Sequence, residues 1–329
     1  MNYPRITVTT PSFNQGRYLE ETIRSVLDQD YPNLEYIIID GASTDDSLEI
    51  IKRYESHLSY WVSERDAGQS EAINKGLKRA TGEIVTWLNS DDLYLPHALT
   101  RAASHFEKCD AALIHGRTEL FGNGFDGMLK GADDDDDLEI RYLSGMPFPQ
   151  PSSFFRRRVL LEQGYLDETL HYGMDYDLVA RIALNYPIRK VEDVFSKYRL
   201  HEESKSVAQN IEFTRDWART FSRVLRSFDF TAELVEHMAA LSLYVEGEDC
   251  YHVGKSFGRE EIRKAFLYFL EFQLYYFYEN LDLRRASELA RFIKDADPAF
   301  YRARSLARIY RRSRPASAAL IKLLRNFTR

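Results

Sequence analysis

The stretch at residues 34–41, LEYIIIDG, contains a continuous apolar run at 36–39 and ends at a carboxylate and a glycine. A short run of this kind, closed by a turn signal, predicts a strand that is buried on both faces. Similar runs occur at residues 6–10, 60–62, 84–88 and 111–115, and segments with helical spacing lie between them. This alternation favours the α/β class, with a mainly parallel sheet covered by helices on both faces.

Polar residues follow these predicted strands at their carboxyl ends, where open parallel sheets bind their ligands. The strand at 84–88 runs directly into Asn89-Ser90-Asp91-Asp92. Two carboxylates there can hold a hard divalent cation that bridges a diphosphate, although adjacent acids also cap helices. The other polar residues at strand ends are Ser12, Asn14, Asp40 and Asp66.

Length and spacing predict two domains. The chain has 329 residues, of which 44% are hydrophobic and 29% charged, as in an ordinary globular protein. Strand signals fade after about residue 205, and helical spacing dominates from about residue 211. We therefore expect a catalytic domain at 1–207 and an α-helical domain at 208–329.

The cysteines and the apolar segments point to a cytoplasmic protein. Cys109 and Cys250 are far apart and form no CxxC pair, so neither a disulfide framework nor a thiolate zinc site is indicated. The chain begins with a strand pattern and has no apolar stretch long enough to span a membrane.

Four ordered motifs carry a family resemblance. They are TTPSFNQGRYL at 9–19, SVLDQDYPNLE at 25–35, IDGASTD at 39–45 and DAGQSEAINKG at 66–76. Together with the acids at 89–92, they resemble family 2 glycosyltransferases, over roughly residues 5 to 205. The resemblance implies the GT-A fold, a nucleotide-sugar donor, and inversion at the anomeric carbon.

The resemblance also implies a donor site. Pro11 and Phe13 would line the nucleoside pocket, and Asp40 would accept hydrogen bonds from the base. Asp66 would hold the nucleoside or the donor sugar, and Asp91 would contact the donor through a metal. The structural alternatives are that Asp40 caps the turn after its strand and that Asp66 is a turn acid before Gly68.

The implied cofactor is Mn²⁺ or Mg²⁺. Asp91 would bind the metal with Asp92 beside it, and His201, in the segment YRLH, would complete the shell. A lone histidine is otherwise a surface or core residue. The family motif often begins with an acid where this chain has Asn89, and many relatives carry a donor-binding arginine where it has Ile73.

The segment YGMDYDL at 172–178 contains the expected general base. Asp175 matches the second acid of a family pair, whose first acid is replaced here by Met174. A base is needed because an acceptor hydroxyl is a poor nucleophile until its proton is removed. Asp177 would have a secondary, orienting role. The structural alternative is that both carboxylates stabilise the first turn of a helix.

The expected partners are a nucleotide-diphosphate sugar, with UDP as carrier, and a glycan or lipid-linked acceptor. Two competing readings are a catalytically weak nucleotide-sugar or carbohydrate-binding scaffold and a sugar nucleotidyltransferase. The second needs a Gly-rich phosphate loop after the first strand, where this chain has Pro11-Ser12-Phe13-Asn14.

The carboxyl-terminal segment has its own charge pattern. Residues 298–329 hold nine Lys and Arg and no Asp or Glu. In 299–312 apolar and basic residues recur at helical spacing, which is typical of a peripheral contact with the inner face of a membrane. The alternative is that the apolar stripe packs on the helical domain. The segment lacks the interleaved basic and stacking residues of a nucleic-acid site, so we expect no nucleic acid.

Overall fold

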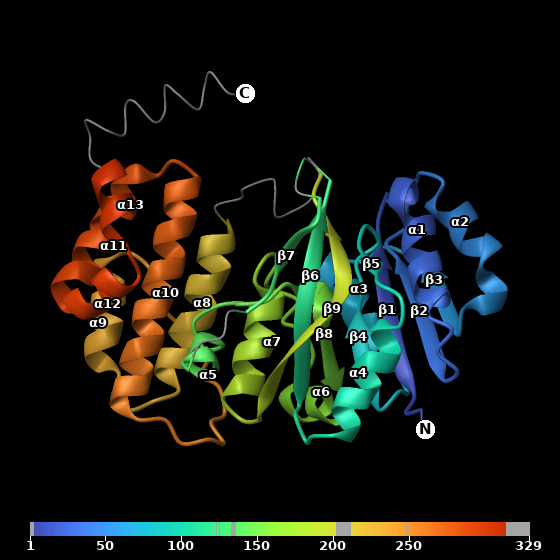
Figure 1. Ribbon diagram of the computed structural model, residues 1–329, viewed down its shortest axis with the longest axis horizontal. Helices are drawn as coiled ribbons and strands as arrows, with labels where there is room; N and C mark the ends of the chain where they lie inside the picture. Colours follow the sequence, from blue (N-terminus) through green and yellow to red (C-terminus); the bar gives the residue numbers. More distant parts are fainter. Residues whose placement is uncertain are drawn as a thin grey trace. The chain divides into compact units, whose positions relative to one another are not determined.

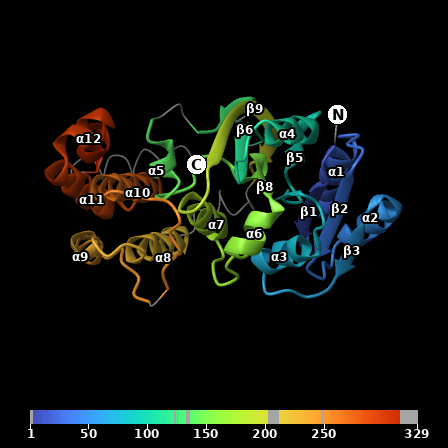
Figure 2. The ribbon, with the colours of Figure 1, turned by 90° about the horizontal axis from the view of Figure 1, so that it is seen from below.

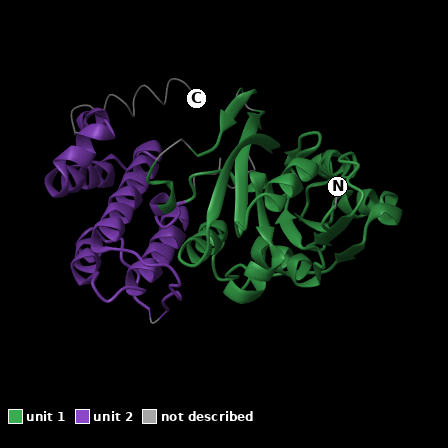
Figure 3. Ribbon diagram, turned by 60° about the horizontal axis from the view of Figure 1, so that its bottom comes forward, with its two compact units in different colours: residues 1–139, 146–210 green, residues 140–145, 211–329 purple. Residues whose placement is uncertain are grey.

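The computed structural model describes residues 3–122, 124, 126–132, 136–201, 212–247 and 249–313. The chain divides into two compact units, coloured separately in Figure 3. Unit 1 comprises residues 1–139 and 146–210, and unit 2 comprises residues 140–145 and 211–329. The predicted domain boundary at 207/208 lies outside the described residues.

The first part of unit 1 alternates strands and helices, as predicted. Strands β1, β2, β3 and β4 pair in the order β3-β2-β1-β4, and all three pairings are parallel. The elements are β1 (Ile6–Ser12), α1 (Gly16–Leu27), β2 (Leu34–Asp40), α2 (Ser47–Arg53), η1 (Glu55–His57), β3 (Tyr60–Ser63), α3 (Gln69–Arg79) and β4 (Ile84–Trp87).

The second part of unit 1 adds antiparallel strands. The sheet of the described residues continues β4-β8-β6-β9-β5, with β7 paired to β6 (Figure 1). Strand β8 runs antiparallel to β4 and β6, whereas β6 and β9 are parallel. The elements are β5 (Leu93–Tyr94), α4 (Ala98–Glu107), β6 (Leu113–Phe121), β7 (Met128–Lys130), α5 (Leu138–Arg141), η2 (Gln150–Ser152), β8 (Ser153–Arg156), α6 (Arg157–Gln163), α7 (Met174–Ala183) and β9 (Ile188–Arg199).

Helices cover both faces of the parallel strands (Figure 2). Helix α1 presents Leu19, Ile23 and Val26 at helical spacing, and all three are fully buried in a cluster that also includes residues of α2 and α4. Helix α3 packs on the opposite face, where Ala72 contacts Ile37 and Ile39 of β2. Burial on both faces explains why β2 reads as a continuous apolar run.

Unit 2 is helical in its described residues. Aromatic contacts join α8 to α10: Phe221 stacks on Phe269 with ring centres 4.3 Å apart, and Trp217 packs at a tilt against Phe272 with ring centres 3.9 Å apart. Trp217 is therefore a packing residue of this unit. The helices are α8 (Glu212–Arg226), α9 (Ala232–Ala240), α10 (Arg259–Glu279), α11 (Leu283–Ala296), α12 (Pro298–Ala303) and α13 (Ala307–Arg312).

The predicted helix at 299–312 is interrupted. Ser305 adopts φ 54° between α12 and α13, a left-handed conformation that a continuous helix does not contain. Leu306 and Ile309 are buried, so part of the apolar stripe packs within unit 2, while Arg308 and Arg312 are exposed. No described helix is long and apolar enough to cross a membrane.

Candidate functional site

The loops that follow β1 and β2 are hydrogen-bonded to each other. Asn14 adopts φ 52°, a left-handed conformation that asparagine tolerates, and its side-chain oxygen accepts a hydrogen bond from the Thr44 amide at 2.8 Å. The Asn14 amide donates to Ser43 Oγ at 2.8 Å, and the Gly16 amide donates to Asp45 at 2.9 Å. These bonds fix the carboxyl-terminal edge of the sheet at its two first strands.

Asp40 ends β2 and is fully buried. Its Oδ2 accepts hydrogen bonds from the Ser43 amide at 2.9 Å and from Ser63 Oγ at 2.6 Å, and its Oδ1 accepts from Ser43 Oγ. The carboxylate thus holds the turn after β2 and joins it to β3. A nucleotide base could reach Asp40 only if this turn moved, so the structure favours the turn-capping alternative.

Phe13, Gly41 and Asp66 lie together at this edge. A Cβ built on Gly41 would lie 2.8 Å from Asp66 Oδ2 and 3.3 Å from the Phe13 ring, so a side chain there would displace Asp66. Phe13 is exposed, with 61% of its surface accessible, so its ring is open to a ligand. Pro11, by contrast, is buried within β1.

Asp66 precedes the amino terminus of α3. Its Oδ1 accepts a hydrogen bond from the Gly68 amide at 3.0 Å. Burial raises the pKa of Asp66 above its ordinary value, and the negative charges of Glu71 and Asp40 act in the same direction, while the Gly68 amide and Lys75 oppose them. An N–H donor from a ligand would therefore stabilise the ionised form of this carboxyl.

Asp91 and His201 meet at the ends of β4 and β9. His201 Nε2 lies 2.9 Å from Asp91 Oδ2, across 110 residues of sequence. Both side chains are partly exposed to solvent, 18% for Asp91 and 12% for His201. The sequence predicted that these two residues belong to one site, and the structure brings them into contact.

Asp92 has a different environment from the one predicted. Its side chain is fully buried; Oδ1 accepts a hydrogen bond from the Arg199 amide at 3.0 Å, and Oδ2 faces the Asn89 amide at 3.4 Å. Burial raises the pKa of Asp92 well above its ordinary value, and the charge of Asp91 adds to this shift. Residues 89–92 form a turn, closed by the Asp92 amide on the Asn89 carbonyl at 3.1 Å, in which the Asp92 side chain is fully buried while that of Asp91 is 18% exposed. This geometry argues against Asp92 as a metal ligand.

The chemistry of Asp91 and His201 fits a divalent cation held jointly by protein and substrate. Mg²⁺ commonly binds one or two carboxylates and completes its shell with phosphate oxygens and water. Among the described residues, no group of three or more His, Cys, Asp and Glu side chains is arranged to hold a metal. The pair therefore fits as a partial ligand set that a diphosphate would complete.

Asp175 lies in the first turn of α7 and is partly exposed. Its Oδ1 accepts a hydrogen bond from the Tyr176 amide at 2.8 Å. The loop that leads to α7 is held on α3: Ser70 Oγ donates to the Leu170 carbonyl at 3.0 Å. His171, in the same loop, has its Nδ1 3.9 Å from a Cβ built on Gly68. The segment carrying Asp175 is thus attached to the helix that begins beside Asp66.

Two other charged residues have structural roles. Asp177 is 1% exposed and pairs with Arg181 at 2.8 Å, and the Arg181 guanidinium also donates to carbonyls at the end of α6. The burial and ion pair of Asp177 favour a packing role in α7. The Lys75 ammonium forms ion pairs with Glu64 at 3.0 Å and with Glu71, one turn earlier in α3, at 3.1 Å. These two carboxylates occupy the ammonium, which argues against Lys75 as a phosphate ligand.

Gln69 and Arg199 were not predicted as site residues, and the structure places both on the acidic motif. Gln69 Nε2 donates to Asn89 Oδ1 at 2.8 Å, which links the amino terminus of α3 to the acidic motif. Arg199 Nε donates to the Asp91 carbonyl at 3.0 Å. A signal for Arg199 was present in its position two residues before His201, but the contact spans 108 residues of sequence.

Comparisons with known proteins agree on a family and a fold. The model of the family described as Glycosyl transferase family 2 matches residues 7–164. An uncharacterized glycosyltransferase of Mycobacterium tuberculosis is 30% identical over 195 residues, which cover 55% of this chain and 70% of that protein. For some other curated relatives, the match spans only 36% of their length.

Two solved structures share the GT-A fold. S. aureus TarS, residues 1–349, in complex with UDP-GlcNAc, is 19% identical with a TM-score of 0.59, over 94% of this chain and 90% of TarS. A mannosyltransferase of Pyrobaculum calidifontis, in complex with GDP-Man and Mn²⁺, is 19% identical with a TM-score of 0.58, over 98% of this chain and 88% of that one. The family motifs, the matched relative and the fold agree, and this chain belongs to glycosyl transferase family 2.

Proposed function

We propose that this chain transfers a sugar from a nucleoside diphosphate sugar to an acceptor hydroxyl, with inversion at the anomeric carbon. The observation that carries the proposal is the contact between Asp91 and His201 at the ends of β4 and β9. Strands β1, β2, β4 and β9 share one direction, so their carboxyl ends lie at the same edge of the sheet. Phe13 and Asp66 lie at that edge too.

The nucleoside would bind at the ends of β1 and β2. The exposed ring of Phe13 offers a face for the base, and Asp66 offers a carboxylate to an N–H donor or a sugar hydroxyl. Asp40 would act on the nucleotide indirectly, by holding the turn at Gly41, and Pro11 would support Phe13 from within β1.

Asp91 and His201 would hold a divalent cation, Mn²⁺ or Mg²⁺, together with the diphosphate. When bound, the cation neutralises charge that develops on the leaving nucleoside diphosphate. The protein supplies a carboxylate and an imidazole from the segments that follow β4 and β9, two strands of the same sheet.

Asp175 would be the general base of a single displacement. The acceptor oxygen forms a bond to the anomeric carbon while the bond from that carbon to the diphosphate oxygen breaks. The hydroxyl proton passes to the Asp175 carboxylate. Attack from the side opposite the leaving group inverts the anomeric configuration.

The neighbours with this fold suggest the donor class. TarS was solved with UDP-GlcNAc, and the Pyrobaculum enzyme with GDP-Man and Mn²⁺. We propose a UDP-sugar as donor and a glycan or lipid-linked acceptor. A catalytically weak binding scaffold would not need Asp91, His201 and Asp175 together, and the loop after β1 lacks the Gly-rich, basic sequence of a nucleotidyltransferase.

A thermal-shift screen tests the donor site. We expect UDP to raise the melting temperature more in Mn²⁺ than in chelator, and more than GDP or dTDP does. A stabilisation that is the same in chelator would contradict the metal-bridged diphosphate, and a preference for GDP would correct the donor class.

Asp66 and Asp40 should respond differently to substitution. Asp66→Ala should weaken UDP binding while leaving the melting temperature near that of the wild type, because among the described residues its carboxylate accepts one hydrogen bond, from the Gly68 amide. Asp40→Ala should lower the free energy of unfolding by about 1.5–3 kcal/mol, the usual cost of losing a hydrogen bond to a charged group. Calorimetry and urea denaturation of both variants check this. An unchanged UDP affinity of Asp66→Ala would show that Asp66 does not bind the nucleotide.

The proposed membrane contact depends on charge. The buried Leu306 and Ile309 cannot insert into a bilayer, whereas Arg308, Arg311 and Arg312 are exposed. Each basic residue near an anionic leaflet contributes about 1 kcal/mol. We expect the protein to sediment with anionic vesicles at low salt, to be released from them at high salt, and not to bind neutral vesicles. Truncation after Asp297 should abolish sedimentation. Protein that stays in the supernatant at low salt would refute the membrane contact.

A further inference from the structure

We propose that Arg199 is a positioning residue that fixes Asp91 relative to His201 and so prepares the cation-binding end of the donor site. This inference rests on the proposed function, because it assigns a role within the same site. The role is indirect: Arg199 acts through Asp91, Asp92 and the aromatic rings around it, and not on the substrate.

The hydrogen bonds of Arg199 converge on the acidic motif. Its main-chain amide donates to Asp92 Oδ1 and its Nε donates to the Asp91 carbonyl, each at 3.0 Å. Its Nη2 donates to the carboxylate of Glu21 on α1. One residue at the end of β9 therefore holds two consecutive residues after β4 and anchors them to a third element. The Asp91 backbone cannot shift without breaking at least one of these bonds.

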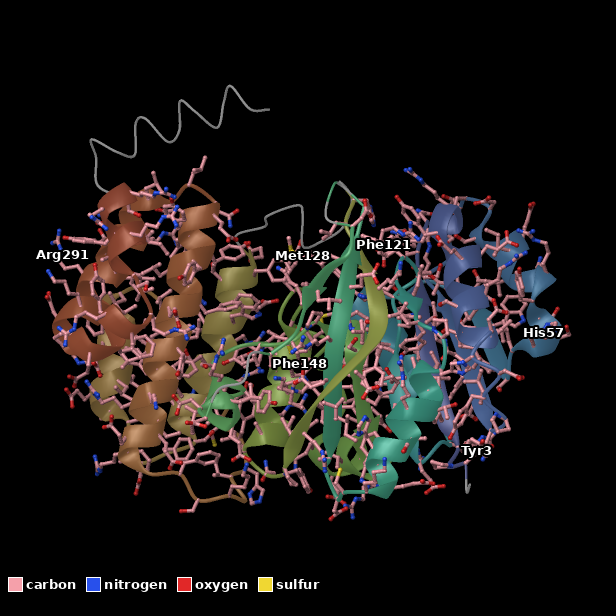
Figure 4. The ribbon with its side chains drawn as sticks, in the orientation of Figure 1. Tyr3, His57, Phe121, Met128, Phe148 and Arg291 are labelled. Atoms are coloured by element: carbon pink, nitrogen blue, oxygen red, sulfur yellow. The ribbon has the colours of Figure 1, made fainter. Side chains whose placement is uncertain are left out.

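Aromatic rings fix the guanidinium from its sides. Its central carbon lies 4.7 Å from the ring centre of Tyr18 and 4.3 Å from that of Phe121, the residue labelled near the end of β6 in Figure 4. Tyr18 also contacts the imidazole of His201, with the ring centres 4.8 Å apart. The same aromatic side chain thus touches both Arg199 and His201.

A second set of bonds holds the acidic motif from the side of α3. Gln69 bonds to Asn89, and Asn89 faces Asp92, whose other oxygen accepts from the Arg199 amide. Asp92, whose buried side chain does not face the proposed cation site, contacts both Asn89 and the Arg199 amide and so connects the two sets of bonds. Its buried carboxyl orients the turn so that Asp91 faces His201.

The geometry requires a fork-shaped side chain. An arginine can place Nε on one acceptor and Nη2 on another while its guanidinium lies near aromatic rings, whereas a lysine ammonium is a point donor. A preset carboxylate and imidazole lower the ordering cost of binding a cation. Arg199→Lys keeps the charge and removes the fork, so it isolates the positioning role.

The test measures Mn²⁺ binding to the protein–UDP complex by electron paramagnetic resonance, and UDP binding in chelator by calorimetry. Loss of an outer partner of a metal ligand costs about 10–100-fold in metal affinity. We expect Arg199→Lys to lose Mn²⁺ affinity by about tenfold or more, with the metal-free UDP affinity retained. Arg24→Lys, on the exposed face of α1, is the matched control and should behave as the wild type.

The outcomes separate this inference from the proposed function. A folded Arg199→Lys protein that binds Mn²⁺ as the wild type does would overturn the positioning role. A wild-type protein that binds no Mn²⁺ with UDP present would overturn the metal part of the proposed function. If Arg199→Lys does not fold, Glu21→Gln decides, because the Glu21 side chain is 58% exposed and its loss should not unfold the protein. We expect it to weaken Mn²⁺ binding by about two- to fivefold, and unchanged binding would also overturn the inference.

Discussion

Asp175→Asn should lower turnover by about 10²–10⁴-fold, the usual cost of removing a general base, while the donor still binds. The asparagine keeps the size of the side chain and the acceptor for the Tyr176 amide, but it cannot take the proton of the acceptor hydroxyl. Steady-state kinetics on the true acceptor, together with calorimetry of UDP in Mn²⁺, measure the two effects separately.

Asp177→Asn is the matched control for this experiment. Asp177 lies in the same helical turn but is buried and paired with Arg181, so its substitution should reduce stability. Breaking a buried pair costs about 3–5 kcal/mol. If Asp175→Asn keeps turnover within about twofold of wild type, well short of the general-base range, Asp175 is not the base.

Asp91→Asn should lower both Mn²⁺ affinity and turnover, by more than about 10²-fold, since even outer partners of a metal ligand are worth 10–100-fold. Excess chelator should abolish the turnover of the wild type for the same reason. The measurements are metal titrations of activity and of the free Mn²⁺ signal.

Asp92→Asn provides the comparison. An asparagine keeps the oxygen that accepts from the Arg199 amide and carries no charge, which suits a site where burial already raises the carboxyl pKa. We expect a smaller loss than for Asp91→Asn. Equal losses of Mn²⁺ affinity and turnover in the two variants would indicate that Asp92 is a metal ligand after all.

The sequence predicted the parallel half of the sheet closely. The strand predicted in the stretch LEYIIIDG is β2, Leu34–Asp40, because its apolar core suits burial on both faces and the turn signal ends it. The charged Glu35 is also buried there, where it accepts hydrogen bonds from Thr7 and Thr81. The sequence also predicted that polar residues after β1, β2 and β4 share an edge. That inference needs only the common direction of the strands.

Other features depended on contacts that the sequence does not show. The antiparallel β8 inserts between β4 and β6, and no local pattern distinguishes its direction. Asp91 and Asp92 are chemically identical neighbours, and only the Arg199 amide, 107 residues beyond Asp92, marks Asp92 as the inward one. The predicted helix at 299–312 has continuous helical spacing, yet the left-handed Ser305 divides it.

The most direct test of glycosyl transfer is the release of nucleoside diphosphate from a panel of nucleotide sugars by the purified protein. We expect slow release from a UDP-sugar in Mn²⁺, acceleration by the true acceptor, none in chelator, and none from Asp175→Asn above background. Donors that remain intact in Mn²⁺, although the protein binds them, would contradict the proposed reaction and favour a binding scaffold.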